Sequence, residues 1–287
     1  MTIGTGSWTS VSGAGTTPSA ADLTGTLRAV VVGTNSTVKI STTTGLTQPM
    51  GYTNWTTGAS EIAFTGSLTD INTALATLSV KGAATGAGSI GVYVAPNSCG
   101  AYNPATDHYY QKLTPSTTGW AAARTYVQGQ SCNGLGGYLA SLDSAAEQSF
   151  TTGKVSTEGA LGGSRFSGSW KWYDGPAGVS GAGVTYSGWC VGEPNGNGNT
   201  MYLSSSRGGC WDDDVDWASY NTSLAIPLIV EYGGILGQSP TQQASGTISL
   251  AVDGTPPTAS WSTVPSTPSN ANPLSYTLTF SEPISGL

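Results

Sequence analysis

The chain has 287 residues, of which only 9% are charged, and its formal net charge at pH 7 is −7. Its nine Lys and Arg residues are scattered, so the sequence offers no basic surface for the phosphates of a nucleic acid. No stretch approaches the roughly 20 apolar residues that a membrane-spanning helix needs. The 41 glycines and the scarcity of helix-forming residues favour two or three mostly β modules.

Residues 1–98 alternate short β-rich runs with turns of glycine, threonine and serine, a pattern typical of a β-sandwich. The exception is SLTDINTALATLSV at 67–80, where leucine and isoleucine recur at helical spacing. This spacing predicts a helix that is capped by Thr69 or Asp70. The run also resembles a segment of the β-sandwich repeats of large bacterial surface proteins.

The central region, residues 101–236, contains most of the tryptophans and most of the acidic residues. GWAAARTYVQ predicts one helix, and SLDSAAEQSFTT predicts a second helix with Ser141 or Asp143 as its cap. Short aromatic strands follow, and the region ends in the apolar run PLIVEYGG. Two helices followed by many short strands predict an α+β domain.

The C-terminal part divides into two further segments. Residues 237–258 contain two adjacent prolines and are interpreted as a linker. Residues 259–287 show period-2 alternation, and the strings TPPT and TFSEPISG resemble the opening of a bacterial immunoglobulin-like repeat. We therefore expect this chain to be a segment of a longer multidomain protein.

The four cysteines allow three pairings, and none lies in a spacing typical of a zinc site. The single histidine, His108, is interpreted as structural. We expect disulfides, with Cys190 paired to Cys210 because each flanks one of two acidic stretches, and hence a secreted or cell-surface location. The alternative is that the cysteines are buried free thiols.

Six short motifs occur along the central region in a fixed order: WAAAR, GGYLASLDSAAEQSF, WKWYDGP, GWCVGEPN, CWDD and LIVEYGG. Their order and approximate spacing resemble the C-type lectin-like domain in its bacterial extracellular form. Each motif is weak alone, whereas the ordered set is specific. The resemblance implies an α+β C-type lectin-like domain, preceded by an all-β sandwich and followed by a partial immunoglobulin-like repeat.

The resemblance also implies a calcium site. Sugar-binding members of the family hold Ca²⁺ with the Glu and Asn of a Glu-Pro-Asn motif, a further acid, and the polar pair of a Trp-Asn-Asp motif. Aspartate replaces the asparagine of that pair here, and Asn199 or Thr200 stands where the further acid would be. The metal ligands expected from this comparison are Glu193, Asn195, Asp212, Asp213 and Asn199.

The chemistry of calcium suits these residue types. Calcium takes six to eight oxygen ligands, and it removes the repulsion of about 1 kcal/mol or more that each close pair of surface carboxylates would otherwise suffer. Open coordination positions accept two sugar hydroxyls. The family's Glu-Pro-Asn order implies a mannose-, glucose- or fucose-like glycan, and a cis peptide bond before Pro194. The ligand-binding residues expected are Glu193, Asn195, Asp212, Asp213 and Trp211.

Other interpretations of the same residues remain open. GEPNGNG is also the composition of an ordinary turn, and DDDVDW that of a solvated acidic loop, with Asp214 and Asp216 outside any site. The module could instead bind a non-sugar protein partner or act as a spacer. Carboxylates beside tryptophans also describe a glycoside hydrolase. Because the acids cluster in one loop, we expect a binding module and not an enzyme.

Overall fold

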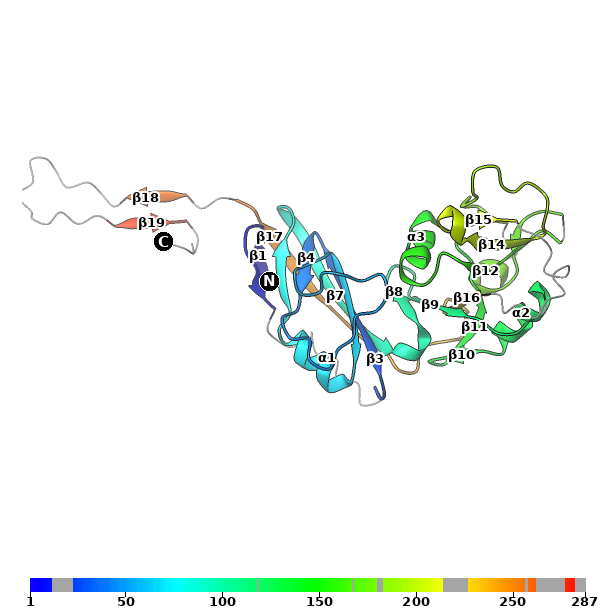
Figure 1. Ribbon diagram of the computed structural model, residues 1–287. Helices are drawn as coiled ribbons and strands as arrows, with labels where there is room; N and C mark the ends of the chain where they lie inside the picture. The colour runs from blue at the N-terminus through cyan, green and yellow to red at the C-terminus, as the bar shows by residue number, and fades with distance from the viewer. Residues whose placement is uncertain are drawn as a thin grey trace, which may run out of the picture.

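The computed structural model describes residues 1–11, 23–117, 119–166, 168–179, 183–213, 227–255, 258–261 and 277–281. Figure 1 shows two bodies that each contain strands and lie side by side, with a hairpin of β18 (Ala259–Trp261) and β19 (Leu278–Phe280) extending beyond the first. Across these described ranges, no helix has the length and apolar character to cross a membrane.

The first module consists of residues 1–96 and 244–253 and contains two sheets. The larger sheet has the order β1-β17-β7-β3-β5, and the smaller has the order β2-β6-β4. Buried apolar side chains, among them Val31, Phe64 and Val80, form its core together with the helix α1. The elements are β1 (Thr2–Gly4), β2 (Thr9–Ser10), β3 (Leu27–Thr34), β4 (Ser36–Lys39), β5 (Glu61–Gly66), α1 (Leu68–Leu75), β6 (Ser79–Gly82), β7 (Gly86–Pro96) and β17 (Ala244–Asp253).

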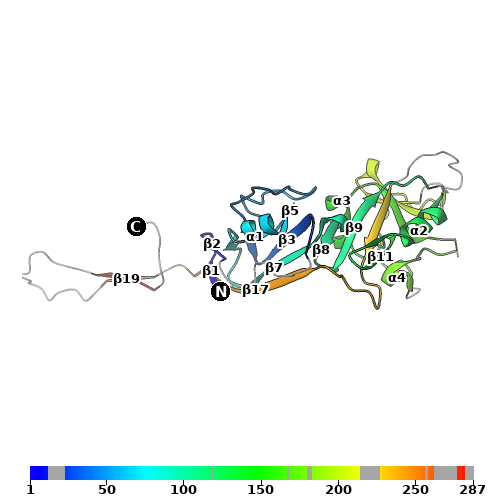
Figure 2. The ribbon, with the colours of Figure 1, turned by 90° about the horizontal axis from the view of Figure 1, so that it is seen from below.

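Strand β17 corrects the interpretation of residues 237–258 as a linker. It pairs antiparallel with β7 from Ala244 to Val252 and parallel with β1. Leu250 and Val252 are buried in the first module's core because strand alternation places them on one face. Figure 2 shows β17 lying alongside the first module's strands after the chain has left the second body. The second body is therefore inserted between two neighbouring strands of the first module's sheet.

Helix α1 begins and ends earlier than the sequence predicts. Its N-cap is Ser67, whose Oγ accepts a hydrogen bond from the Asp70 backbone N–H at 3.2 Å, and neither Thr69 nor Asp70 is the cap. Residues 79 and 80, predicted to continue the helix, belong to β6 and pair with β2 and β4. The pairing of this end with two strands outweighs its helical spacing.

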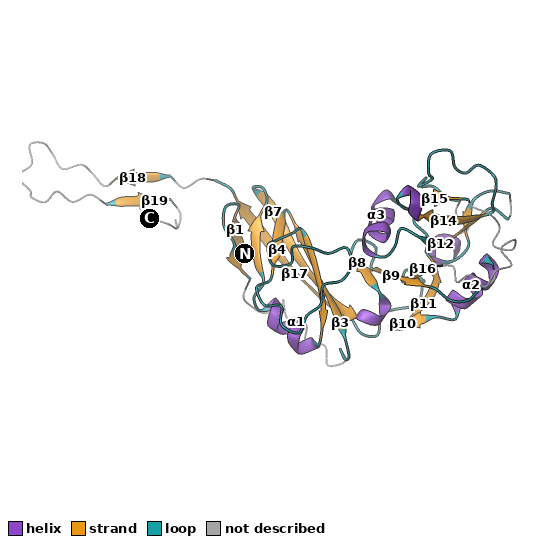
Figure 3. Ribbon diagram, in the orientation of Figure 1, coloured by secondary structure: helices purple, strands orange, loops and turns teal. Residues whose placement is uncertain are grey.

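The described residues of the second module, which spans 97–236, form nine strands and three α-helices, and this confirms the predicted α+β class. Figure 3 shows α2 and α3 flanking the strands of this sheet. The elements are η1 (Asn97–Cys99), β8 (Ala101–Asn103), β9 (His108–Leu113), α2 (Trp120–Gln128), β10 (Ser131–Cys132), β11 (Leu135–Leu139), α3 (Ala145–Lys154), β12 (Gly159–Ser164), β13 (Lys171–Trp172), α4 (Gly175–Val179), β14 (Thr200–Ser204), η2 (Ser205–Arg207), β15 (Cys210–Asp212) and β16 (Leu228–Tyr232).

Both predicted helices of this module are present. Helix α2 buries Trp120, Ala123 and Val127 along one stripe, as the spacing predicts. Helix α3 is capped by Ser144, whose Oγ accepts from the Glu147 backbone N–H at 3.1 Å, and neither Ser141 nor Asp143 is the cap. Ser141 instead donates its backbone N–H to Glu231 on β16, which holds the segment before the helix against the sheet.

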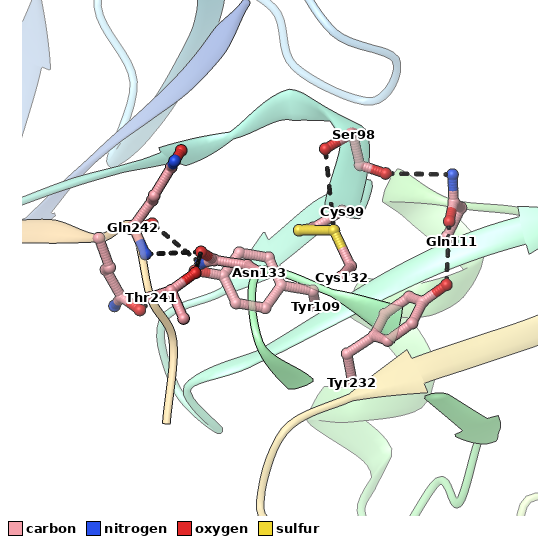
Figure 4. The surroundings of a disulfide bond; sticks show 10 residues. Ser98, Cys99, Tyr109, Gln111, Cys132, Asn133, Tyr232, Thr241 and Gln242 are labelled. Carbon is pink, nitrogen blue, oxygen red and sulfur yellow. Dashed lines mark hydrogen bonds between the residues drawn. A yellow bond between two sulfur atoms is a disulfide. The ribbon is translucent and has the colours of Figure 1, made fainter. Parts of the chain in front are cut away.

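Two disulfides close the second module: Cys99–Cys132, and Cys190–Cys210 as predicted. Figure 4 shows Asn133 beside the first of these, where its side-chain oxygen accepts hydrogen bonds from Thr241 and Gln242. The segment that leads into β17 is thus tied to the second module just before it returns to the first. These disulfides are consistent with an oxidising, extracellular compartment.

The two modules are packed against each other. Lys154, at the end of α3, donates to the Gly51 carbonyl at 2.6 Å, and its Nζ lies 3.6 Å from the centre of the Tyr52 ring. Val30 of the first module lies in the same buried cluster as Tyr109 of the second. Buried apolar contacts of this kind make the relative position of the modules part of the fold.

Candidate functional site

The candidate site lies where the loop of residues 190–199 meets β15. The Cys190–Cys210 disulfide joins these segments, and the Cys190 backbone N–H donates to the Trp211 carbonyl at 2.8 Å. The Glu193–Pro194 peptide bond is cis, as predicted. In Figure 1, β15 lies at the end of the molecule far from β1 and β19. This geometry brings residue 193 beside residues 212 and 213.

Three carboxylates gather at this position. Glu193, Asp212 and Asp213 each contribute an oxygen, and these three oxygens lie within 4.8 Å of one another. Two segments separated by the intervening strand β14 supply them. We call these three residues the loop cluster. The sequence predicted all three as metal ligands, and the structure brings them together.

Asp213 organises the loop from beneath. Its side chain is fully buried, its Oδ1 accepts from the Asn195 backbone N–H at 2.9 Å, and its Oδ2 accepts from that of Gly196 at 3.0 Å. Because backbone amides hold both of its oxygens, Asp213 fixes the path of the loop. The prediction that Asp213 contacts the ligand requires a side chain that faces the surface. The side chain of Asp213 is buried instead.

Arg207 covers the outer side of the loop cluster. Its guanidinium donates to Glu193 Oε1 at 2.8 Å and lies 3.7 Å from Asp212 Oδ2. The side chain of Glu193 is only 3% exposed, whereas that of Arg207 is 45% exposed. The arginine therefore shields the carboxylate from solvent. Sequence reasoning missed Arg207 because an isolated arginine in a serine- and glycine-rich turn carries no signal of its partner.

Arg165 lies on the inner side of the same loop. Its Nε donates to Asn199 Oδ1 at 3.0 Å, and its terminal nitrogen lies 3.8 Å from Asp213 Oδ2. The amide oxygen of Asn199, predicted to be a metal ligand in place of the family's acid, thus accepts from an arginine instead. Thr200, the other candidate for that position, is buried in β14. Arg165 was also missed by the sequence analysis.

Trp211 does not line the site, contrary to the prediction that it contacts the ligand. It is fully buried and packs nearly perpendicular to the rings of Trp172, Tyr186 and Trp189. Neighbouring residues of a strand point to opposite faces, so Trp211 faces the core where Asp212 faces the loop. Asp214 and Asp216 lie outside the described residues.

The structure also reveals a second group of acidic side chains that the sequence did not predict as a unit. Glu231 on β16 accepts from the Ser141 backbone N–H at 3.0 Å and lies 2.6 Å from His108 Nδ1. The Tyr110 hydroxyl contacts both Glu147 and Glu231. We call His108, Glu147 and Glu231 the inner cluster. It joins α3 to β9 and β16, and it gives His108, which was interpreted as structural, a hydrogen-bond partner on β16.

Burial controls the ionisation of the inner cluster. Burial, and then the negative charge of Glu231, raises the pKa of Glu147 to about 7. Burial lowers the pKa of His108, but its hydrogen bond to Glu231 and the charges of Glu231, Glu147 and Asp107 outweigh burial, so the net pKa is raised. The cluster therefore limits its net negative charge by holding protons.

The loop cluster fits calcium in part. Its oxygen-only donors and their spacing suit a hard divalent cation. The amide oxygen of Asn195, also predicted as a ligand, accepts a hydrogen bond from the Asn197 backbone N–H at 3.0 Å. The guanidinium of Arg207, however, bonds to Glu193 and approaches Asp212, where a cation would bind.

Comparison with known proteins gives two sequence relatives. The type-2 ice-structuring protein of Hemitripterus americanus is 31% identical over 151 residues, which are 51% of this chain and 85% of that protein. Halomucin of Haloquadratum walsbyi strain DSM 16790 / HBSQ001 is 31% identical over 199 residues, which are 64% of this chain but only 2% of halomucin's own length.

Among solved structures, the chain is similar to a calcium-independent type II antifreeze protein. The identity is 24%, the TM-score is 0.33, and the match covers 45% of this chain and 88% of the other. No protein-family model matches the chain.

Proposed function

Because the chain belongs to the family of the type-2 ice-structuring protein, which has a C-type lectin-like fold, we propose that its second module is a carbohydrate-binding module of an extracellular protein. The ligand class is a glycan of the mannose, glucose or fucose type. Binding, and not catalysis, is the proposed activity. The module would act as part of an adhesin.

The loop cluster is the observation that carries this proposal. Glu193 and Asp212 come from separate segments, yet their oxygens and one of Asp213 lie within 4.8 Å of one another. Carboxylates gather in this way where a cation or a set of hydrogen-bond donors compensates their charge. A sugar diol supplies such donors, since each hydroxyl can donate a hydrogen bond to a carboxylate and accept one from an amide N–H.

Calcium is part of this proposal. Glu193, Asn195 and Asp212 would hold the ion, while Asp213 supports the loop and adds negative charge from below. Bound calcium would offset the repulsion between the carboxylates and supply open coordination positions for two hydroxyls. Glu193 and Asn195 would then orient the diol through hydrogen bonds.

A glycan array probed with the whole chain, in millimolar calcium and again in EDTA, tests the proposal. We expect binding to mannose-, glucose- or fucose-type glycans that EDTA abolishes. The variant Glu193→Gln with Asn195→Asp should shift the preference toward galactose while keeping some calcium. A blank array with a calcium-dependent melting shift would instead support a spacer or protein-binding role, and glycan turnover would support a hydrolase.

The family relationship favours a second candidate, binding to ice, because the relative from Hemitripterus americanus is named an ice-structuring protein. A thermal-hysteresis measurement on the whole chain distinguishes the two. Hysteresis without glycan binding would replace carbohydrate recognition with ice binding as the function of the second module.

A further inference from the structure

We propose that the junction between the two modules forms a further binding site, a polar groove that takes a segment of a neutral saccharide without a metal ion. This inference goes beyond the proposed function, because the groove shares no residue with the loop cluster. The volume of the groove is about 610 Å³, which lies within the range of about 300–1,000 Å³ that is typical of ligand pockets.

Four segments that are distant in the sequence meet at this groove. The first module contributes the turn before β3, at residues 24–26. The end of β7 continues into η1 at residues 96–98, and the turn between β10 and β11 adds residues 133 and 134. Residues 241 and 242, which lead back into β17, complete the lining. The groove therefore exists because the second module is inserted into the first, and ligand pockets occur preferentially at such junctions.

Direct bonds hold these segments in place. The disulfide between η1 and β10 joins two of them. The Asn97 backbone N–H donates to the Thr26 carbonyl at 3.0 Å. The side chain of Asn133 holds the returning segment, because its Oδ1 accepts from the Gln242 backbone N–H at 2.6 Å and its Nδ2 donates to the Gln242 carbonyl at 2.8 Å (Figure 4). Walls that are linked in this way need little ordering when a ligand binds.

The same bonds leave several polar groups of the lining available to a ligand. The Oδ1 of Asn97 accepts from Arg28 Nε at 3.1 Å, which fixes the orientation of the amide. Among the described residues, the Nδ2 of Asn97 has no hydrogen-bond partner. The side-chain amide of Gln242 and the hydroxyl of Thr26 also have none within the part of the chain that the structure describes. The groove thus presents donors and acceptors on a fixed frame.

The lining determines the class of ligand. Its polar side chains are hydroxyls and amides, among them Thr24, Asn97 and Gln242, and none of the lining residues is charged. An amide offers a donor and an acceptor, and a hydroxyl can serve as either, as the hydroxyls of a saccharide also can. A charged ligand would find no counter-charge in this lining. Calcium would find no carboxylate there.

NMR titration of the isotopically labelled whole chain in EDTA tests the inference. The probes are maltohexaose, cellohexaose and mannohexaose, each at millimolar concentration. We expect the side-chain amide signals of Asn97 and Gln242 to shift with at least one of them. Binding through a few hydrogen bonds in an open groove is weak, so a titration in solution detects it and a washed glycan array does not. Binding at the loop cluster, which is proposed to need calcium, would be absent in EDTA.

Two variants each remove one contact without breaking the frame of the groove. Asn97→Asp keeps an oxygen that accepts from Arg28 but loses the amide donor. Gln242→Ala removes the side-chain amide, while the backbone groups that bond to Asn133 remain. Each variant should weaken saccharide binding about twofold to tenfold, which corresponds to the loss of one hydrogen bond.

Gln128→Ala is the matched control. Gln128 is an exposed glutamine on α2 of the second module, its Nε2 donates to Asp174 Oδ1 at 2.9 Å, and it does not line the groove. Its replacement should leave the saccharide affinity unchanged. The backbone spectrum of each variant shows in the same experiment whether the chain is folded.

The outcomes distinguish this inference from the proposed function. Shifts in EDTA that both groove variants weaken would support the inference, whatever the loop cluster binds. If none of the three saccharides shifts these signals, or if the native chain and both variants bind equally well, the groove is not a saccharide site and the proposed function is unaffected. Shifts caused by tetraalanine but not by the saccharides would overturn the ligand class in favour of a peptide.

Discussion

The second module contains two groups of acidic side chains that differ in what compensates their charge. In the inner cluster, Glu231 is 1% exposed and its contacts are a histidine, a tyrosine hydroxyl and a backbone amide, all fixed by the sheet. In the loop cluster, the side chain of Glu193 is also nearly buried, at 3% exposed, but the group that covers it is the exposed side chain of Arg207.

This difference shows that residue type alone does not decide how a group of acidic side chains is held in the fold. Both clusters place three potential metal ligands within the same 4.8 Å limit. The compensating groups of the inner cluster cannot leave without breaking the contact between α3 and the sheet. The compensating group of the loop cluster is an arginine side chain that is 45% exposed. Three predictions, from the largest expected effect to the smallest, test this contrast.

Removing Glu231 should have the largest effect. Glu231→Ala would leave His108 and the Ser141 N–H without their buried partner, so the free energy of unfolding should fall by about 3–5 kcal/mol. Glu193→Ala, in the loop cluster, should lower it less, because its partner Arg207 is 45% exposed and water can solvate the guanidinium that is left. Urea unfolding of both variants makes the comparison. Equal losses would mean that the two clusters are equally structural.

Replacing Asp213 should lower the free energy of unfolding by an intermediate amount. Asp213 belongs to the loop cluster, but its side chain is buried like that of Glu231 in the inner cluster. Asp213→Ala removes the acceptor of the Asn195 and Gly196 amides, which should cost about 1–3 kcal/mol and abolish calcium and sugar binding. Urea unfolding and calcium calorimetry measure the two consequences. Asp213→Asn, which keeps one carbonyl acceptor, should lose less stability. Full retention of calcium by the alanine variant would contradict the role given to Asp213.

The smallest effect concerns pH. The pKa of Glu147 rises from 4.5 to about 7 on folding, so the folded chain holds this proton more tightly than the unfolded chain. Its contribution to stability is therefore complete below pH 4.5 and is lost as pH rises through about 7. The raised pKa of His108 acts in the same direction. Stability should fall by on the order of 1 kcal/mol between pH 5 and 8 relative to Glu147→Gln. Parallel pH profiles of the two proteins would refute this.

Local patterns predicted much of the second module. The apolar stripe of α2, the α+β class and the pairing of Cys190 with Cys210 could all be inferred from short stretches of sequence. The carboxylates of the loop cluster were predicted through the ordered motifs. In each of these cases the relevant residues lie in one segment or in a motif with a fixed order.

Contacts between distant segments could not be predicted in this way. Strand β17 shows the ordinary alternation of a strand with one buried face, but its partner β7 lies about 150 residues earlier, and the prolines after it suggested a linker. His108 and Glu231 are separated by 123 residues, and no motif links them. Arg207 pairs with the loop through a side-chain conformation that spacing does not encode. The inward direction of Trp211, by contrast, could have been inferred from alternation with Asp212.

The pairing of β1 with β17 has a mechanical consequence. These strands run parallel, with Thr2 to Gly4 opposite Ala251 to Asp253. A pull applied between residue 1 and residue 255 would load their hydrogen bonds in shear, so that the bonds resist together instead of opening one after another. Tension would pass directly from one strand to the other. The second module would stay off the load path, and its loops would keep their shape under traction for as long as that short ladder holds.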